Sequence, residues 1–194
     1  MNQLSRIPMP ARVVIVLVAA LLLSLLLMRQ SSSDLRATAA TNPPITGQCT
    51  GAAGVIKGDV TIKGREGTYA ISALSDGLKT PIDTASGQVS GRRQHQPLVF
   101  TTVLGRATPL LIRAQVNNEN LSSCTFNFWR ASATGVEQNY FRIKLTNAHL
   151  VSYQLSGRPG AGSTTTFSLV YQKIEWTYLI GGLTASDDWA APLG

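Results

Sequence analysis

The amino-acid sequence predicts a mainly β protein: a closed β-barrel with one short α-helix, preceded by a single apolar helix near the N-terminus. Short segments along most of the chain alternate apolar and polar residues with a period of two. One segment follows helical spacing, and one uninterrupted apolar run lies close to the start. With 194 residues, 44% of them hydrophobic, the chain can build one core, which we place in residues 45–194.

The apolar run reads VVIVLVAALLLSLLLM and covers residues 13–28, between Arg12 and Arg29. As a helix it would extend over about 24 Å, slightly less than a hydrocarbon core, and flanking arginines can snorkel to cover the difference. We therefore expect residues 1–29 to form a single-pass membrane anchor. The basic residues on its N-terminal side favour an N-terminus inside the cell, with the rest of the chain on the far side of the membrane.

Two other interpretations of the N-terminus stay open. The apolar run barely exceeds that of a signal peptide, and Ala37-Thr38-Ala39 matches a small-residue cleavage pattern. Alternatively, translation could start at Met28, which would remove the apolar run altogether.

Residues 30–44, QSSSDLRATAATNPP, are small and polar and end in Pro43-Pro44. This composition is typical of a flexible linker, which the two prolines stiffen as it approaches the folded domain.

Alternation predicts the strands of the folded domain. In FRIKLTN, residues 141–147, Phe141, Ile143 and Leu145 share one face of a strand and polar residues share the other. Closure into a barrel is favoured because it removes the free edges that such strands would expose. The other segments with this character are 58–64, 125–130, 149–155 and 166–180.

Residues 107–121, ATPLLIRAQVNNENL, predict the short helix. Thr108 is expected as the N-cap and Pro109 as the first helical residue. Asn117-Asn118 is expected to stop the helix.

The net charge of +7 does not predict nucleic-acid binding, because the charge is unevenly placed. Several arginines lie in the first 44 residues, and in the folded domain Arg92-Arg93 is the only adjacent basic pair. The sequence therefore contains no basic stripe that could follow a phosphate backbone.

No motif predicts catalysis, a cofactor or a metal. The two histidines, His95 and His149, have no neighbouring cysteine or acid in a known spacing, and the chain lacks a nucleophile elbow, a P-loop and a dinucleotide fingerprint. Asp187-Asp188 would splay its carboxylates apart in an extended chain. We therefore expect a protein that is not an enzyme and that works through its surfaces.

Cys49 and Cys124 are too few for a four-ligand zinc site. In a reducing compartment they would be two small apolar side chains. In an exported domain they could form a disulfide that closes a loop of about 75 residues and contributes up to about 4 kcal/mol.

Four blocks of sequence resemble the haemolysin-coregulated protein (Hcp) family of type VI secretion tubes. The blocks are SGRRQHQPLVFTTVLGRATPLLIRAQVNNENL (90–121), GVEQNYFRIKLTNAHLVS (135–152), FSLVYQKIEWTY (167–178) and SDDW (186–189). The resemblance implies a two-sheet barrel whose copies form a ring, commonly a hexamer, without cofactor or catalysis. Rings stack into a tube that associates with spike and sheath proteins and carries effector proteins.

The resemblance also implies where copies touch. Residues 79–97 correspond to an extended loop that reaches a neighbouring subunit or ring, which makes Arg92, Arg93 and His95 contact candidates. The helix corresponds to an element that faces the tube interior or a subunit contact. Its candidate residues are Thr108, Arg113, Asn117 and Asn118.

The apolar N-terminus departs from the family. An anchored chain would lie in the inner membrane with its barrel in the periplasm, and the alternative function is then a membrane-anchored binding module that forms no tube. If the start lies further in, the protein would be cytoplasmic and then secreted.

Overall fold

The computed structural model describes residues 42–158 and 162–189 of the chain. The predicted anchor in residues 1–29 and nearly all of the predicted linker lie outside these residues. Within the described part, no helix combines the length and the apolar character that a membrane crossing needs.

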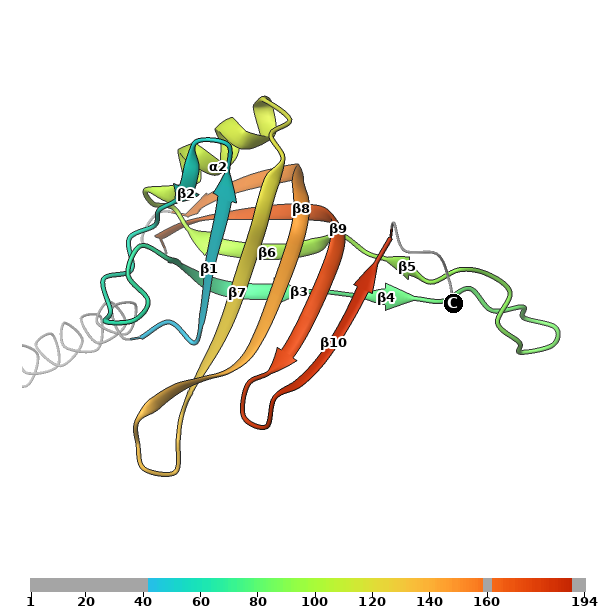
Figure 1. The fold of residues 1–194 in the computed structure, drawn as a ribbon. Coiled ribbons are helices and arrows are strands. Elements are labelled where there is room, and N and C mark those ends of the chain that lie inside the picture. The colour runs from blue at the N-terminus through green and yellow to red at the C-terminus, as the bar shows by residue number, and fades with distance from the viewer. Residues whose placement is uncertain (1–41, 159–161, 190–194) are drawn as a thin grey trace, which may run out of the picture. The chain divides into compact units, whose positions relative to one another are not determined.

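The described chain folds into antiparallel strands and one α-helix, shown in Figure 1. Their bounds are β1 Ile45–Gly51, β2 Gly54–Ile56, β3 Tyr69–Ser75, β4 Leu78–Lys79, β5 Gln94–His95, β6 Leu98–Val103, α2 Ala107–Val116, β7 Leu121–Ala131, β8 Glu137–Arg158, β9 Gly162–Tyr178 and β10 Leu183–Asp188.

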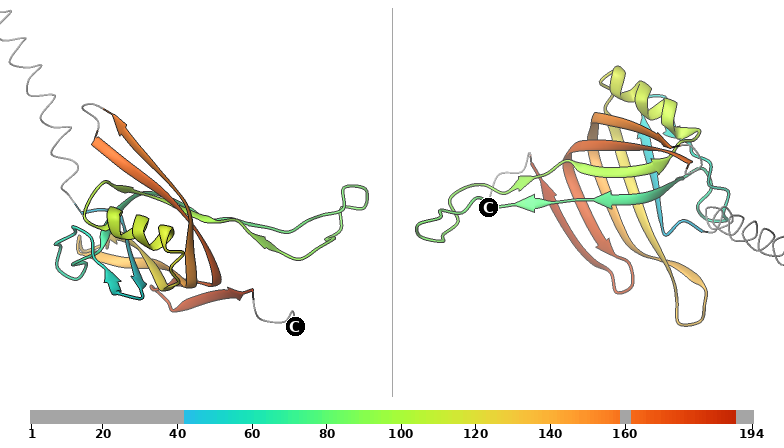
Figure 2. Two further views of the ribbon diagram at one scale, coloured as in Figure 1. Left: turned by 90° about the horizontal axis from the view of Figure 1, so that it is seen from above. Right: turned by 180° about the vertical axis from the view of Figure 1, so that it is seen from behind.

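Six strands close into a barrel, as the sequence predicted. Each pairs with the next in the order β9, β6, β3, β1, β7 and β8, and β8 pairs again with β9 (Figures 1 and 2). The length of β9 allows this closure. Its residues 164–169 lie between β6 and β8, whereas residues 173–178 lie between β8 and β10.

Four of the five segments read as strands lie wholly or mostly in strands. Residues 125–130 belong to β7, and most of residues 166–180 belong to β9. Residues 141–147 and 149–155 form one strand, β8.

The fifth segment, residues 58–64, is a loop, so its predicted strand is wrong. The chain turns back on itself: the Gly58 N–H donates to the Gly67 carbonyl at 2.8 Å, and the Gly67 N–H donates to the Val60 carbonyl at 2.9 Å. Gly64 and Gly67 have φ of 82° and 71°, a conformation that glycine adopts readily and that strands do not use. These glycines therefore override the local alternation.

The barrel is filled by the inward faces of its strands. Phe100 of β6 lies between two other phenylalanines, with ring centroids 5.3 Å from Phe126 of β7 and 5.4 Å from Phe167 of β9. All three rings and Leu98 are fully buried. Such ring pairs add about 0.5–1.5 kcal/mol each beyond the burial of their surface. This cluster joins strands that are distant in the sequence.

Cys49 of β1 and Cys124 of β7 form a disulfide. The strand register places them directly opposite each other, with their Cα atoms 4.1 Å apart, and both are fully buried. The Tyr69 hydroxyl lies 3.1 Å from the Cys49 sulfur, and burial raises the pKa of this phenol. The disulfide thus ties two neighbouring barrel strands together.

Helix α2 begins slightly earlier than the sequence predicted, and Thr108 is not its N-cap. The N-cap is Arg106, whose N–H donates to the Asp59 carboxylate at 2.8 Å. Thr108 lies inside the first turn, where its hydroxyl accepts from the Gly105 N–H at 3.1 Å. A carboxylate from a distant loop therefore supplies the cap, and negative charge there also suits the helix dipole.

The predicted stop of the helix at Asn117-Asn118 is confirmed. Asn117 is the C-cap, and Asn118 takes the left-handed conformation with φ of 48°. The N–H groups of Asn118 and Glu119 donate to the carbonyls of Gln115 and Ala114, at 3.0 and 2.8 Å. This is the Schellman arrangement, with asparagine at the position that glycine usually occupies.

Candidate functional site

Residues 76–97 leave the barrel between β3 and β6 and form a long projecting loop, here called the arm (Figures 1 and 2). A short ladder and a single bridge order it: Leu78 pairs with His95 where β4 meets β5, and Ile82 pairs with Val89 further out. The arm contains the region that the sequence predicted as an extended loop.

The tip of the arm is held by Asp83. Its carboxylate accepts from the N–H groups of Ala85 and Ser86, both at 2.8 Å, and these bonds lower the pKa of Asp83. Apolar side chains nevertheless remain in solvent: Ile82 is 60% exposed and Val89 is 70% exposed. The arm is therefore a structured loop that presents apolar surface.

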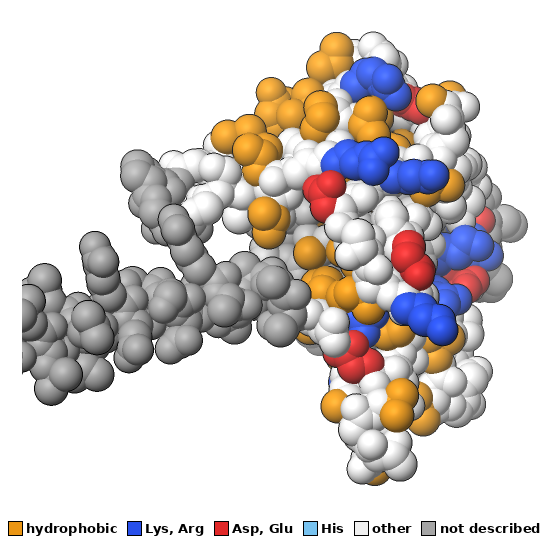
Figure 3. Space-filling view, turned by 90° about the vertical axis from the view of Figure 1, so that its left-hand side faces the viewer, with side chains coloured by type: hydrophobic (Ala, Val, Ile, Leu, Met, Phe, Trp, Pro, Cys, Tyr) orange, Lys and Arg blue, Asp and Glu red, His pale blue; other side chains and the backbone are white. Residues whose placement is uncertain are grey.

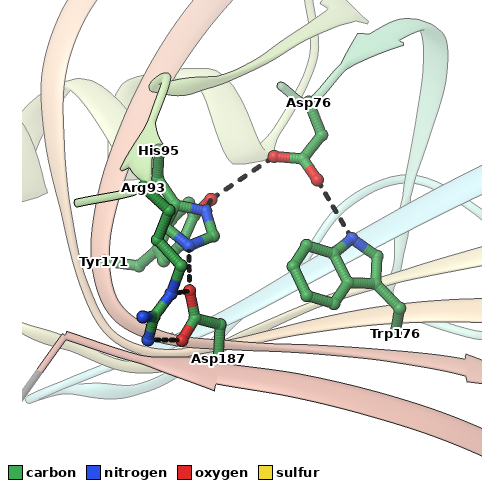
Figure 4. Close-up of polar contacts among 6 residues, drawn as sticks. All are labelled: Asp76, Arg93, His95, Tyr171, Trp176 and Asp187. Atoms are coloured by element: carbon green, nitrogen blue, oxygen red, sulfur yellow. Dashed lines mark hydrogen bonds and ion pairs between the residues drawn. The ribbon is translucent and has the colours of Figure 1, made fainter. Parts of the chain in front are cut away.

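At the base of the arm, Asp187 of β10 binds two arm residues (Figure 4). Arg93 donates from Nε and Nη2 to the two carboxylate oxygens, and His95 Nε2 lies 2.6 Å from Oδ2. Arg93, and after it His95, hold the pKa of Asp187 well below its usual range, against a smaller opposing effect of burial. Asp187 is therefore ionised and acts only as an acceptor.

Tyr171 of β9 continues this network to the other end of the arm. Its hydroxyl lies 3.1 Å from His95 Nδ1 and 3.3 Å from an oxygen of Asp76, and Trp176 Nε1 donates to the second oxygen of Asp76 at 3.0 Å. Burial, with the charges of Asp76 and Asp187, raises the pKa of Tyr171, so the phenol keeps its proton. We call Asp76, Arg93, His95, Tyr171, Trp176 and Asp187 the arm latch.

Aromatic rings enclose His95. Its ring centroid lies 5.6 Å from that of Tyr171, 6.2 Å from Trp176 and 5.2 Å from Trp189. The His95 side chain is only 4% exposed as a result. The latch therefore fixes both the start and the end of the arm to strands β9 and β10.

The predicted contact residues of the arm have different surroundings. Arg93 and His95 are bound within their own chain, where both contact the Asp187 carboxylate. Arg92 is exposed, with no hydrogen bond or ion pair to a described residue. Arg92 is thus the arginine whose planar guanidinium remains available to a partner.

The predicted contact residues of the helix lie apart from the arm, because α2 and the arm leave the barrel at different places (Figure 1). Arg113, Asn117 and Asn118 are exposed. Thr108 is only 2% exposed, so we leave it out of the surfaces proposed below.

The sequence did not predict that Asp76, Tyr171, Trp176 and Asp187 would contribute to a site. Asp187 was considered only as half of an adjacent acidic pair, and the described residues contain no group of acids, histidines and cysteines suited to a metal ion. The one signal in the sequence that pointed to Asp187 was its place in the block SDDW, one of the four blocks that resemble the family.

A buried arginine, Arg65, contacts the residues that directly precede β1. The Arg65 guanidinium donates to the Pro43 carbonyl at 3.1 Å, pairs with the Glu137 carboxylate, and stacks 3.9 Å from the centre of the Trp129 ring. The backbone N–H of Trp129 in turn donates to the Pro44 carbonyl at 2.8 Å. We call Arg65, Trp129 and Glu137 the entry clasp.

Charged groups elsewhere on the surface are mixed. On the face shown in Figure 3, lysine and arginine side chains are interspersed with acidic ones and do not gather in a single stripe.

The family model described as type VI secretion system effector, Hcp, matches residues 45–178. The major exported protein of Pseudomonas aeruginosa is 32% identical over 143 residues, which cover 70% of this chain and 83% of that protein. A solved variant of Hcp1 from E. coli is 30% identical with a TM-score of 0.71, and the match covers 76% of this chain and 99% of that one. Hcp3 from P. aeruginosa is 26% identical with a TM-score of 0.63, covering 75% and 99%.

These matches cover the barrel strands, the arm and the helix together. The chain therefore belongs to the Hcp family of type VI secretion proteins.

Proposed function

We propose that the chain is a structural subunit of a type VI secretion tube, in which rings of about six copies stack into a conduit for effector proteins. Membership of the Hcp family supports this function. The structural observation that carries it is the arm: a loop fixed at its base by the latch, with apolar residues left in solvent.

Such an arm suits contact between copies. A protruding segment that fits a different surface on the next copy makes a heterologous contact, which generates rings or stacks rather than a closed dimer. The exposed Ile82 and Val89 would supply apolar contact area, and Arg92 would bind carboxylates or carbonyl groups. Arg113 on α2, with Asn117 and Asn118 directly after it, would provide a second contact surface.

In this proposal the subunit needs neither cofactor nor catalytic residues, and it binds no nucleic acid. Its partners are other copies of itself, the spike and sheath proteins of the secretion system, and effectors.

Light scattering of the full chain in mild detergent tests the proposal. We expect a particle of about six copies at high protein concentration. A particle that stays monomeric at all concentrations would count against ring formation.

The disulfide favours a second candidate, a membrane-anchored periplasmic module that does not form tubes. Disulfides form and persist in oxidising compartments such as the periplasm, whereas a tube assembled in the cytoplasm would be built from reduced chains. In this alternative residues 13–28 hold the chain in the inner membrane. Periplasmic activity of a reporter fused after Gly194 would favour the module, and cytoplasmic activity would exclude it.

A further inference from the structure

We infer that the redox state of Cys49 and Cys124 is fixed at the moment the barrel closes, and that a thiol–disulfide oxidase must act on the unfolded chain to form their disulfide. The folded protein then keeps the state, dithiol or disulfide, in which it closed. The same holds whether the folded chain builds a tube or acts as an anchored module. Cys49 and Cys124 are the only cysteines of the chain, so no third thiol can exchange with them.

Neighbouring strands enclose both cysteines. In the strand register, Cys49 lies between Ile56 of β2 and Cys124 of β7. Cys124 lies between Cys49 and Leu145 of β8. Neither cysteine is therefore on an edge strand. Both cysteines and Leu145 are fully buried, and Ile56 is only 7% exposed.

Tyr69 of β3 covers the Cys49 sulfur from inside the barrel. Its hydroxyl lies 3.1 Å from this sulfur, and burial raises the pKa of the phenol, so the phenol keeps its proton as a donor. The Tyr69 ring packs with Phe100, with centroids 6.1 Å apart. A Cβ atom at Gly47 would lie 2.6 Å from Tyr69 Cε2, so β1 itself lies close against the ring. The ring thus has little room to move away from the sulfur.

Formation of the disulfide proceeds through a bulky intermediate. One cysteine thiolate attacks a disulfide sulfur of the oxidant, which forms a mixed disulfide and releases one thiolate of the oxidant. The second cysteine thiolate then attacks the first cysteine's sulfur and releases the other oxidant thiolate. The chain loses two electrons and two protons, and the oxidant becomes a dithiol. Reduction of the disulfide follows the same steps in reverse.

The closed barrel has no room for this mixed disulfide. The space around the two sulfurs is filled by fully buried side chains such as Phe126, two residues after Cys124 on β7. Protein interiors are packed as densely as organic crystals. A sulfur can therefore exchange only when β1 and β7 separate, and core strands open at a free energy close to that of global unfolding.

The redox state of the native protein consequently reports where the chain folded. A chain that closes its barrel in a reducing compartment keeps two thiols, even after it reaches an oxidising one. A chain that crosses the membrane unfolded can meet an oxidase before closure and then keeps the disulfide. A thiol count on the protein from its native compartment would thus distinguish the tube subunit from the anchored module.

An order-of-addition experiment on the full chain in mild detergent tests the inference. The reduced chain is diluted from urea to refold, and oxidised glutathione is added either before dilution or after far-UV circular dichroism shows a folded protein. We expect early addition to give the disulfide and late addition to leave two thiols, with oxidation at least about a hundredfold slower after folding. A maleimide added to samples unfolded in detergent counts the thiols by gel mobility.

The reverse reaction provides a second measurement that does not need a folded dithiol form. The folded disulfide form is exposed to dithiothreitol with and without urea. We expect reduction to be at least about a hundredfold slower without urea.

A thiol on an exposed position of β7 is the matched control. Ser122 is exposed, so Ser122→Cys in a chain that also carries Cys49→Ala and Cys124→Ala presents one accessible thiol. This thiol should form a mixed disulfide with glutathione at rates within about tenfold of each other with and without urea, because access does not limit it.

Three outcomes would overturn the inference. The first is oxidation of the folded dithiol form at nearly the rate seen in urea, and the second is equally rapid reduction of the folded disulfide form. The third is a dithiol form that stays unfolded after dilution, because only the disulfide form could then close the barrel and no choice would be recorded. None of these outcomes depends on ring formation, which the light-scattering experiment tests separately.

Discussion

Arg93 and Asp187 lie 94 residues apart in the sequence, and the guanidinium of Arg93 binds both carboxylate oxygens of Asp187. The planar fork of arginine matches a carboxylate in this two-bond geometry, which fixes orientation as well as distance. The contact joins the arm to β10, and it also occupies two nitrogens of the Arg93 guanidinium, whose side chain is 33% exposed.

The first prediction concerns Arg92. Because its side chain is exposed and Arg93 is already bound, Arg92→Glu should weaken assembly while the barrel stays folded. We expect at least a tenfold rise in the concentration needed for assembly, about the effect of losing one charge-assisted contact. Light scattering measures assembly, and far-UV circular dichroism checks the fold. Arg130→Glu makes the same charge change away from the arm and should assemble normally; equal losses in both variants would argue for a general effect of charge.

The second prediction concerns acid and Asp187. A carboxyl whose pKa is lowered in the folded state contributes stability above its unfolded pKa of about 4, and loses it as the pH falls toward the folded value. Asp187→Asn should therefore unfold at a lower temperature than the wild type near neutral pH, and the difference should shrink below about pH 4. Thermal unfolding at a series of pH values checks this. Asp188→Asn provides the comparison, and a gap for Asp187→Asn that stays constant at low pH would contradict the prediction.

The third prediction concerns the disulfide. Reducing it should lower the free energy of unfolding by up to about 4 kcal/mol, because the cross-link restricts a loop of 75 residues in the unfolded chain. Denaturant unfolding with and without a reducing agent measures the loss. The double variant Cys49→Ala, Cys124→Ala should be less stable and insensitive to the reducing agent. If the agent changes the double variant as much as the wild type, the effect does not come from this bond.

The fourth prediction concerns Gly58. A Cβ atom there would lie 2.4 Å from the Thr68 carbonyl oxygen, and backbone cannot move aside as a flexible side chain can. Gly58→Ala should therefore destabilise the protein by about 1–3 kcal/mol, the usual range for overpacking. Gly77→Ala, whose added carbon would meet Gln96 at an ordinary 3.5 Å, should change stability much less. Similar denaturant midpoints for the two variants would show that the backbone around Gly58 shifts to make room for the added carbon.

Local patterns in the sequence predicted the helix and most of the strands. The arm latch depends instead on contacts between residues that are distant in the sequence. The alternation of Phe141, Ile143 and Leu145 predicted a strand because a strand with one buried face requires that pattern. The end of α2 at Val116 was likewise predicted by the adjacent Asn117-Asn118. The cap from Asp59 and the bonds of Tyr171 to His95 come from segments far away in the sequence, so no window of residues contains them.

The fifth prediction concerns the entry clasp and compares two stacked arginines. Arg65 is buried, and Arg65→Met would leave the Glu137 carboxylate and the Pro43 carbonyl without their donor. We expect a loss of about 3 kcal/mol, since a charged group deprived of its partner is costly. Arg130 also stacks on a ring, 4.7 Å from the centre of Tyr140, but it is exposed.

Arg130→Met should therefore cost less than about 1 kcal/mol, as exposed cation–π pairs do. Denaturant unfolding of the two variants measures the difference. Because both substitutions remove one positive charge and keep an apolar stem, the difference between them reports the burial of Arg65 and its bonds to Glu137 and Pro43. Equal losses would mean that the clasp contributes no more to stability than a surface contact.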